Sequence, residues 1–136
     1  MIVNTVALYL ESLTATDVAG SPICKAFGDS FTFGTNLFIG LEPVSTVDTL
    51  TIIPYGGLRP DRDKKRQAAA IQLRFKTSSR YKSLSVQQAC IDTLDSNYLN
   101  GGGFMRANSS APMIIMSEDN DRKIVSVSNY IVKYIK

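Results

Sequence analysis

The fold of this chain is decided by residues 49–76, which read TLTIIPYGGLRPDRDKKRQAAAIQLRFK. The first six, Thr49 to Pro54, are rich in β-branched side chains, as strands are. Near the other end apolar and polar residues alternate, which is typical of a strand with one buried face. The apolar positions there are Ile71, Leu73 and Phe75. The stretch therefore predicts two strands joined by a long charged loop, with Pro54 at a strand end because proline donates no ladder hydrogen bond.

The loop between these strands belongs to a basic segment. From Arg59 to Lys82 there are nine Lys or Arg and two Asp, a net charge of +7, whereas the rest of the chain has six basic and ten acidic residues, a net charge of −4. This separation indicates an anionic partner or a lumen near the segment, although such charges also simply keep an exposed hairpin soluble. The residues that we assign to an interface or a lumen are Arg59, Arg62, Lys64, Lys65 and Arg66.

Length and composition narrow the class of protein. The 136 residues are 44% hydrophobic and 20% charged, which predicts a single globular domain over residues 1–136. No apolar run approaches the ~20 residues of a membrane span, and no signal peptide is recognisable at Met1, so we expect a protein made and kept in a cytoplasm. Cys24 and Cys90 lie far apart and are expected to be unpaired thiols. The absence of histidine argues against most hydrolase and zinc chemistry.

Two amphipathic helices are predicted. In residues 1–13 the apolar side chains fall on one arc at 100° per residue, and in residues 83–99 a second apolar face includes Cys90 and Tyr98. Ser85 and Gln88 have the spacing of a capping box at the start of the second helix. The run from Asn100 to Gly103 ends it.

The other segments predict strands. Residues 23–34 are ambiguous and predict an irregular segment with a short edge strand. A polar hairpin turn is expected at residues 118–121, and a bulge near Ser128 and Asn129, where the alternation slips. The expected strands are residues 36–42, 49–54, 67–76, 104–108, a buried one at 113–116, and 122–136. The order α-β-β-β-α-β-β-β predicts an α+β fold, a largely antiparallel sheet with two helices packed on one face.

Catalytic and metal-binding patterns are weak. The glycines at 101–103 follow a helix and lack the Lys and the Ser or Thr of a phosphate-binding loop, and residues 118–121 supply only a fragment of a calcium loop. Asp92 and Asp95 are three residues apart on a helix, but nothing buries them as acid catalysis would require. We therefore predict no enzyme, no cofactor and no metal site.

Nucleic-acid binding has limited support. The basic segment could contact phosphates, but reading bases needs a recognition helix or several exposed aromatic rings, and only Tyr55 and Tyr81 lie near it. Non-specific contact is the interpretation that fits. The two aspartates within the segment also suit ion pairs between subunits.

Several features occur in a recognisable order. They are an amphipathic first helix, a strand ending in Ile52-Ile53-Pro54-Tyr55-Gly56-Gly57, a return strand with Gln67 and Gln72-Leu73-Arg74, and a second helix from near Ser83. In this order they resemble phage minor capsid proteins of the tail-terminator type, and the resemblance runs from Met1 to Lys136.

The resemblance implies a structural protein of the virion, located in the tail or neck of a long-tailed phage and assembled in the host cytoplasm. Such proteins are small α+β proteins that form a ring, expected to be a hexamer. The ring caps the finished tail tube, ends its polymerisation and joins the tail to the head connector. The expected partners are copies of the chain itself, the tail-tube protein and the head connector or completion protein, with non-specific contact to DNA in the channel. No catalysis, cofactor or membrane is implied.

Other functions remain open at this point. The chain could be a small nucleic-acid-binding protein that uses Arg59 to Lys82, or another head-tail completion protein. It could also be an enzyme subunit or an inhibitor whose partner supplies the chemistry. Oligomeric state, measured free and with a tail-tube protein, discriminates between these hypotheses.

Overall fold

The computed structural model describes residues 2–13, 21–40, 47–57, 66–99, 103–109, 111–116 and 123–135. Within these residues the helices are α1 (Ile2–Ser12), α2 (Pro22–Phe27) and α3 (Arg80–Leu94). The strands are β1 (Leu37–Ile39), β2 (Thr49–Gly57), β3 (Arg66–Thr77), β4 (Asn97–Leu99), β5 (Gly103–Ala107), β6 (Met113–Met116) and β7 (Ile124–Ile135).

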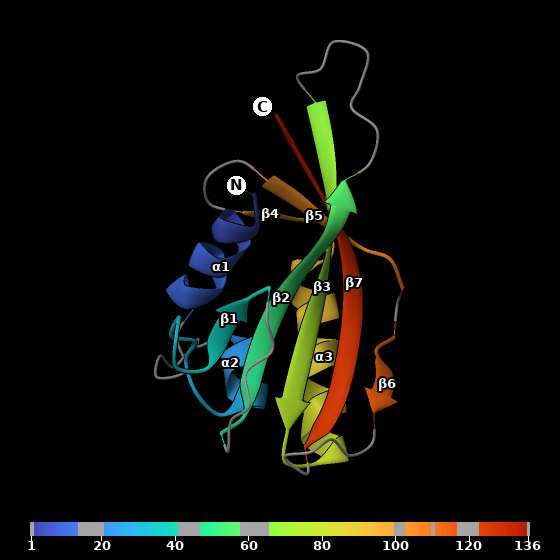
Figure 1. Ribbon diagram of the computed structural model, residues 1–136. Helices are drawn as coiled ribbons and strands as arrows, with labels where there is room; N and C mark the ends of the chain where they lie inside the picture. The colour runs from blue at the N-terminus through green and yellow to red at the C-terminus, as the bar shows by residue number, and fades with distance from the viewer. Residues whose placement is uncertain are drawn as a thin grey trace.

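All of these strands belong to one sheet, in the order β1-β2-β3-β7-β5-β4, with β6 also paired to β7. β1 runs parallel to β2, and the other pairs are antiparallel. The central ladder joins β3 to β7 without a register shift, from Arg66 opposite Ile135 to Thr77 opposite Ile124. The predicted α+β fold with a largely antiparallel sheet is therefore confirmed (Figure 1).

The helices cover one face of the sheet. Figure 1 views the opposite face, so that α3 lies behind β3 and β7 while α1 lies to one side. On the covered face Leu73 and Phe75 of β3 are fully buried, and the ring of Phe75 lies 5.8 Å from that of Phe27 in α2. Each such large side chain contributes about 1.5–3 kcal/mol on burial, so this layer supplies most of the folding energy. The buried strand residues that join the core include Leu50, Ile52, Ile71, Met105, Tyr130 and Val132.

Helix α1 confirms the prediction for residues 1–13. Its inward face packs into the core through Val3, Val6, Ala7 and Leu10. The residues opposite are exposed, and Leu8 is one of them, with 66% of its surface accessible.

Helix α2 lies where the sequence predicted an irregular segment, so that prediction is wrong, and three helices cover the sheet in the described part of the chain instead of two. Its start is a local capping motif: Ser21 Oγ accepts a hydrogen bond from Ile23 N at 3.2 Å, and Pro22 occupies the first helical position. Gly28 ends the helix in the left-handed region at φ +90°, a conformation that favours glycine. The helix is only six residues long, which is too short for its apolar periodicity to stand out in the sequence.

Helix α3 starts earlier than predicted. It begins at Arg80 instead of Ser83, and the cap is Ser79, whose Oγ accepts from Lys82 N at 3.1 Å. The proposed capping box of Ser85 and Gln88 is therefore wrong, because both residues lie inside the helix.

The end of α3 also differs from the prediction. The helix stops at Leu94, because Asp95 is extended and Ser96 takes a positive φ of 59°. Ser96 N then donates to Met105 O at 2.8 Å, which starts the pairing of β4 with β5. Residues 97–99 are a strand, so Tyr98 is not on the helix face assigned to it but 75% exposed on β4.

Three strand details were also predicted wrongly. Pro54 lies inside β2, opposite Ile71, at a level that β1 does not reach, so this part of β2 tolerates a residue without N–H. β6 is not buried at the positions whose side chains are described, since Met113 is 55% exposed and Ile114 is half-buried. No bulge occurs at Ser128, because the β3–β7 register is continuous there. The hairpin turn at 118–121 and residues 100–102 lie outside the described residues.

The slip in alternation near Ser128 has a chemical cause. Ser126 and Ser128 point into the core, where α3 supplies their hydrogen-bond partners. Ser83 Oγ donates to Ser126 Oγ at 2.8 Å, and Ser128 Oγ lies 2.6 Å from Gln87 Oε1 and 3.0 Å from Tyr130 Oη. Gln87 Nε2 also donates to the main-chain oxygen of Leu73 at 3.1 Å. This buried polar network fixes where α3 lies on the sheet, because each group would otherwise be buried without a partner.

Replacing Gln87 by Ala should be costly. It removes the amide that satisfies both Leu73 O and Ser128 Oγ and leaves a cavity, so we expect a loss of ~2–4 kcal/mol in the free energy of unfolding. Gln88→Ala is the matched control, since Gln88 is only half-buried and donates to the exposed Asp92. Its expected cost is below ~1 kcal/mol. Urea unfolding measures both, and equal losses would contradict the network's role.

Candidate assembly surfaces

The five basic residues assigned to an interface or a lumen lie in the sequence between β2 and β3 and at the first position of β3. Arg59, Arg62, Lys64 and Lys65 lie outside the described residues. Arg66 is the first residue of β3, where its backbone pairs with that of Ile135. Arg66 therefore lies at the end of β3 farthest from the Thr49–Lys76 pair. The assignment of these five residues to an interface or a lumen stays a prediction.

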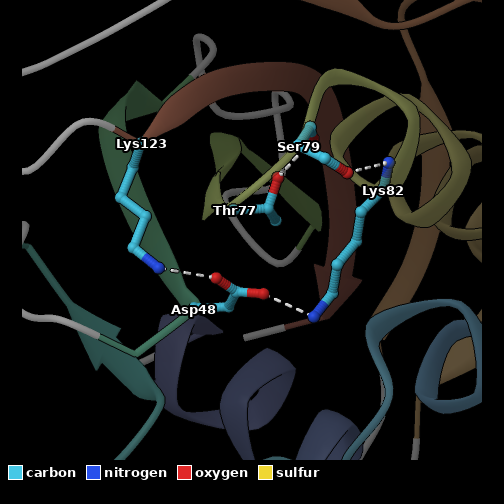
Figure 2. Close-up of polar contacts among 5 residues, drawn as sticks. All are labelled: Asp48, Thr77, Ser79, Lys82 and Lys123. Atoms are coloured by element: carbon cyan, nitrogen blue, oxygen red, sulfur yellow. Dashed lines mark hydrogen bonds and ion pairs between the residues drawn. The ribbon is translucent and has the colours of Figure 1, made fainter.

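At that opposite end of the sheet, Asp48 joins three elements. It lies just before β2, and its carboxylate bonds Lys82 in the first turn of α3 and Lys123 just before β7 (Figure 2). Lys123 Nζ lies 2.9 Å from Asp48 Oδ1, and the side chains of Lys123 and Asp48 are only 11% and 14% exposed. Lys82 Nζ binds the other carboxylate oxygen and lies 5.2 Å from the centre of the Phe27 ring.

This ion cluster of Asp48, Lys82 and Lys123, which we call the Asp48 joint, has a structural role. Both ammonium groups are engaged by Asp48, and Thr77 Oγ1 supports the α3 cap by donating to Ser79 O at 3.0 Å (Figure 2). Burial alone would raise the pKa of Asp48, but hydrogen bonds and charge from the two lysines outweigh it and hold that pKa below its usual value. The carboxylate therefore stays ionised at neutral pH and holds the starts of β2, α3 and β7 together.

Asp48→Asn should destabilise the protein in a pH-dependent way. Because its pKa is lowered on folding, Asp48 stabilises the folded state above about pH 4, the usual value for Asp, and this contribution is lost as the pH falls through the folded pKa. We expect a loss of ~1–3 kcal/mol at pH 7, less than for a fully buried pair because Lys82 is 29% exposed. Thermal unfolding from pH 7 to pH 3 measures it.

The difference in Tm between wild type and Asp48→Asn should be constant down to about pH 5 and shrink below pH 4. Asp29→Asn is the control, since Asp29 is exposed and its described hydrogen bond is local, to Ser30 N. It should change stability by no more than ~0.5 kcal/mol. A Tm difference for Asp48→Asn that is the same at pH 7 and pH 3 would refute this role.

A second candidate assembly surface is the sheet face away from the helices. At the end near β4 and β5 its side chains are half-buried or exposed, and we call this region the open sheet face. It consists of Ile53, Ala68, Ala70, Gln72, Tyr98, Phe104, Arg106, Asn129, Ile131 and Lys133. At the other end of the same face Thr49, Thr51, Val125 and Val127 are buried.

The open sheet face is mostly apolar and carries positive charge. Tyr98 and Phe104 stand opposite each other on β4 and β5, with ring centres 4.8 Å apart. Lys133 is the direct cross-strand neighbour of Phe104, and Arg106 is that of Ile131. Arg106 is partly neutralised, since its Nε lies 3.5 Å from Asp95 Oδ1, whereas Lys133 is exposed and forms no ion pair with a described residue.

The groups considered for catalysis are not arranged for it. Cys24 and Cys90 are fully buried free thiols, and burial raises the pKa of each, which disfavours the reactive thiolate. Asp92 and Asp95 are exposed, and they accept hydrogen bonds from Gln88 and from the backbone of Ala107. The described residues contain no group of three His, Cys, Asp or Glu placed to hold a metal ion. Nor does any helix among them have the length and apolarity to cross a membrane.

Comparison with known proteins decides the family. A family model described as bacteriophage tail terminator protein matches residues 25–135, from within α2 to the last residue of β7. The chain belongs to this family. No curated protein matches the chain. The resemblance seen in the sequence is confirmed, and the tail terminator family is a structural, non-enzymatic family of phage tail proteins, which makes the chain a virion component.

Neither the ion cluster around Asp48 nor the open sheet face was predicted from the sequence. Asp48 and Lys123 come together only through the fold, because 75 positions separate them. Tyr98 was assigned to a helix, so its stacking on Phe104 could not be anticipated. The alternation of Phe104 with Met105 was the one available signal, since Met105 is fully buried and Phe104 faces the other way.

Proposed function

We propose that copies of this tail terminator protein form a ring, expected to be a hexamer, on the end of the phage tail tube. The ring ends tube polymerisation and then joins the tail to the head connector or completion protein. The family match over residues 25–135 is the observation that carries this proposal. In this proposal residues 1–136 act as one domain, and assembly takes place in the host cytoplasm before the virion is complete.

The surfaces of the protein support an assembly role. Leu8, Phe33, Tyr81, Tyr98 and Met113 are each more than half exposed, and large apolar side chains of this kind are enriched in protein interfaces. Along the sequence, net charge of opposite sign is also segregated, +7 between Arg59 and Lys82 and −4 elsewhere, although Lys82 pairs with Asp48 within the subunit. Such separation suits head-to-tail contact between identical copies, where unlike patches meet and a ring closes.

The basic segment has two candidate roles in such a ring. Arg59, Arg62, Lys64, Lys65 and Arg66 could face the channel and contact passing DNA through its phosphates, without reading sequence. They could equally pair with acidic groups on a neighbouring copy. A ring repeats the segment once per copy, so that weak phosphate contacts add up.

Purified protein should stop the growth of tail tubes. When it is added to polymerising tail-tube protein, light scattering should level off early and electron micrographs should show shorter tubes than in its absence. Tyr130→Ala, which removes a fully buried ring, is a suitable misfolded control and should have no effect. Tubes that grow to the same length with and without the wild-type protein would rule the proposal out.

A further inference from the structure

We propose that the outer stripe of α1 of one copy docks on the open sheet face of the next copy, with Glu11 paired to Lys133. The outer stripe of α1 is defined by Asn4, Leu8 and Glu11, which are exposed and spaced at i, i+4 and i+7. This inference rests on the ring proposed above and names the contact that closes it. α1 lies outside residues 25–135, so the family match does not assign it a role.

The outer stripe of α1 points away from the described core of its own subunit. Val3, Val6, Ala7 and Leu10 take the inward face of the helix into the core, which turns Leu8 to solvent at 66% exposure. Glu11 is one turn further along and forms no ion pair with a described residue. The stripe therefore combines one exposed leucine with one exposed carboxylate that no described residue pairs.

The open sheet face offers the complementary pattern. Its centre is apolar, with Phe104 and Ile131 half-buried and the small Ala68 and Ala70 beside them on β3. The cations Lys133 and Arg106 each stand opposite an apolar residue, none of the residues of the open sheet face is acidic, and Arg106 reaches Asp95, which follows α3. Of these two cations, Lys133 is the one that forms no ion pair with a described residue.

The spacing of apolar and charged groups matches on the two surfaces. Leu8 and Glu11 are separated by about 4.5 Å along the helix axis, from a rise of ~1.5 Å per residue. Phe104 and Lys133 lie on adjacent strands, which are about 4.8 Å apart. Leu8 can therefore rest on Phe104 while Glu11 reaches the ammonium group of Lys133.

The geometry makes this contact head-to-tail. α1 packs against the helix-covered side of the sheet near β1, β2 and β4, whereas the open sheet face is turned the other way (Figure 1). In a ring each copy contributes the stripe to one neighbour and the sheet face to the other, whereas two copies that exchanged both contacts would close as a dimer, which sedimentation velocity distinguishes from a ring. A stable interface buries about 800 Å² per partner, so residues around the stripe and the face also take part.

A charge swap tests the pairing. Glu11→Lys and Lys133→Glu should each raise the dissociation constant of the oligomer at least tenfold, because each places like charges together. The double variant restores an opposite pair between copies and should return the constant to within threefold of wild type. Sedimentation velocity over a range of concentrations measures all three, with circular dichroism to check that each variant is folded.

Two matched controls separate this contact from general surface effects. Lys25→Glu reverses an exposed lysine on α2 and should leave the oligomer unchanged. Leu8→Ala should weaken the oligomer, whereas Val47→Ala, which shortens another exposed aliphatic side chain just before β2, should not. Single swaps without effect, or a double variant as weak as the singles, would overturn the inference while leaving the ring intact. A wild-type protein that stays monomeric, alone and with tail tubes, would overturn both.

Discussion

The rest of the structure depends on the long ladder between β3 and β7, and on the two serines that β7 turns into the core. Twelve consecutive residue pairs hold the strands in one register. Because Ser126 and Ser128 are fully or nearly fully buried, they need partners, and Ser83 and Gln87 of α3 supply them. The helix is therefore fixed on the sheet by specific hydrogen bonds as well as by apolar packing, which is non-directional.

Fixing α3 on one face determines what the other face can do. α1, α2 and α3 share the covered side, and the Asp48 joint ties the starts of β2, α3 and β7 at one end. The end of the uncovered side near β4 and β5 then presents the Tyr98–Phe104 pair, Lys133 and Arg106. Membership of the tail terminator family suggests interaction with other phage tail or head proteins, and this face is a candidate surface for such contacts.

Much of the fold was predictable, for identifiable reasons. The alternation of Ile71, Leu73 and Phe75 has the period of a strand, and the helix from residues 1–13 has an unbroken apolar arc, so both were assigned correctly. The wrong predictions concern places where tertiary contacts determine the local structure. Ser96 reverses the chain without a glycine, and the serines of β7 look like a bulge until α3 is in place. The contact between the exposed Tyr98 and the half-buried Phe104 could not be found, because the two rings meet only when β4 pairs with β5.

The most direct test of the account is to image tail tubes assembled with this protein by cryo-electron microscopy. A closed ring of identical copies at one end of each tube is the predicted result, with α1 of each copy against the uncovered sheet face of its neighbour. Copies bound along the tube wall, or tube ends without additional density at saturating protein, would contradict it.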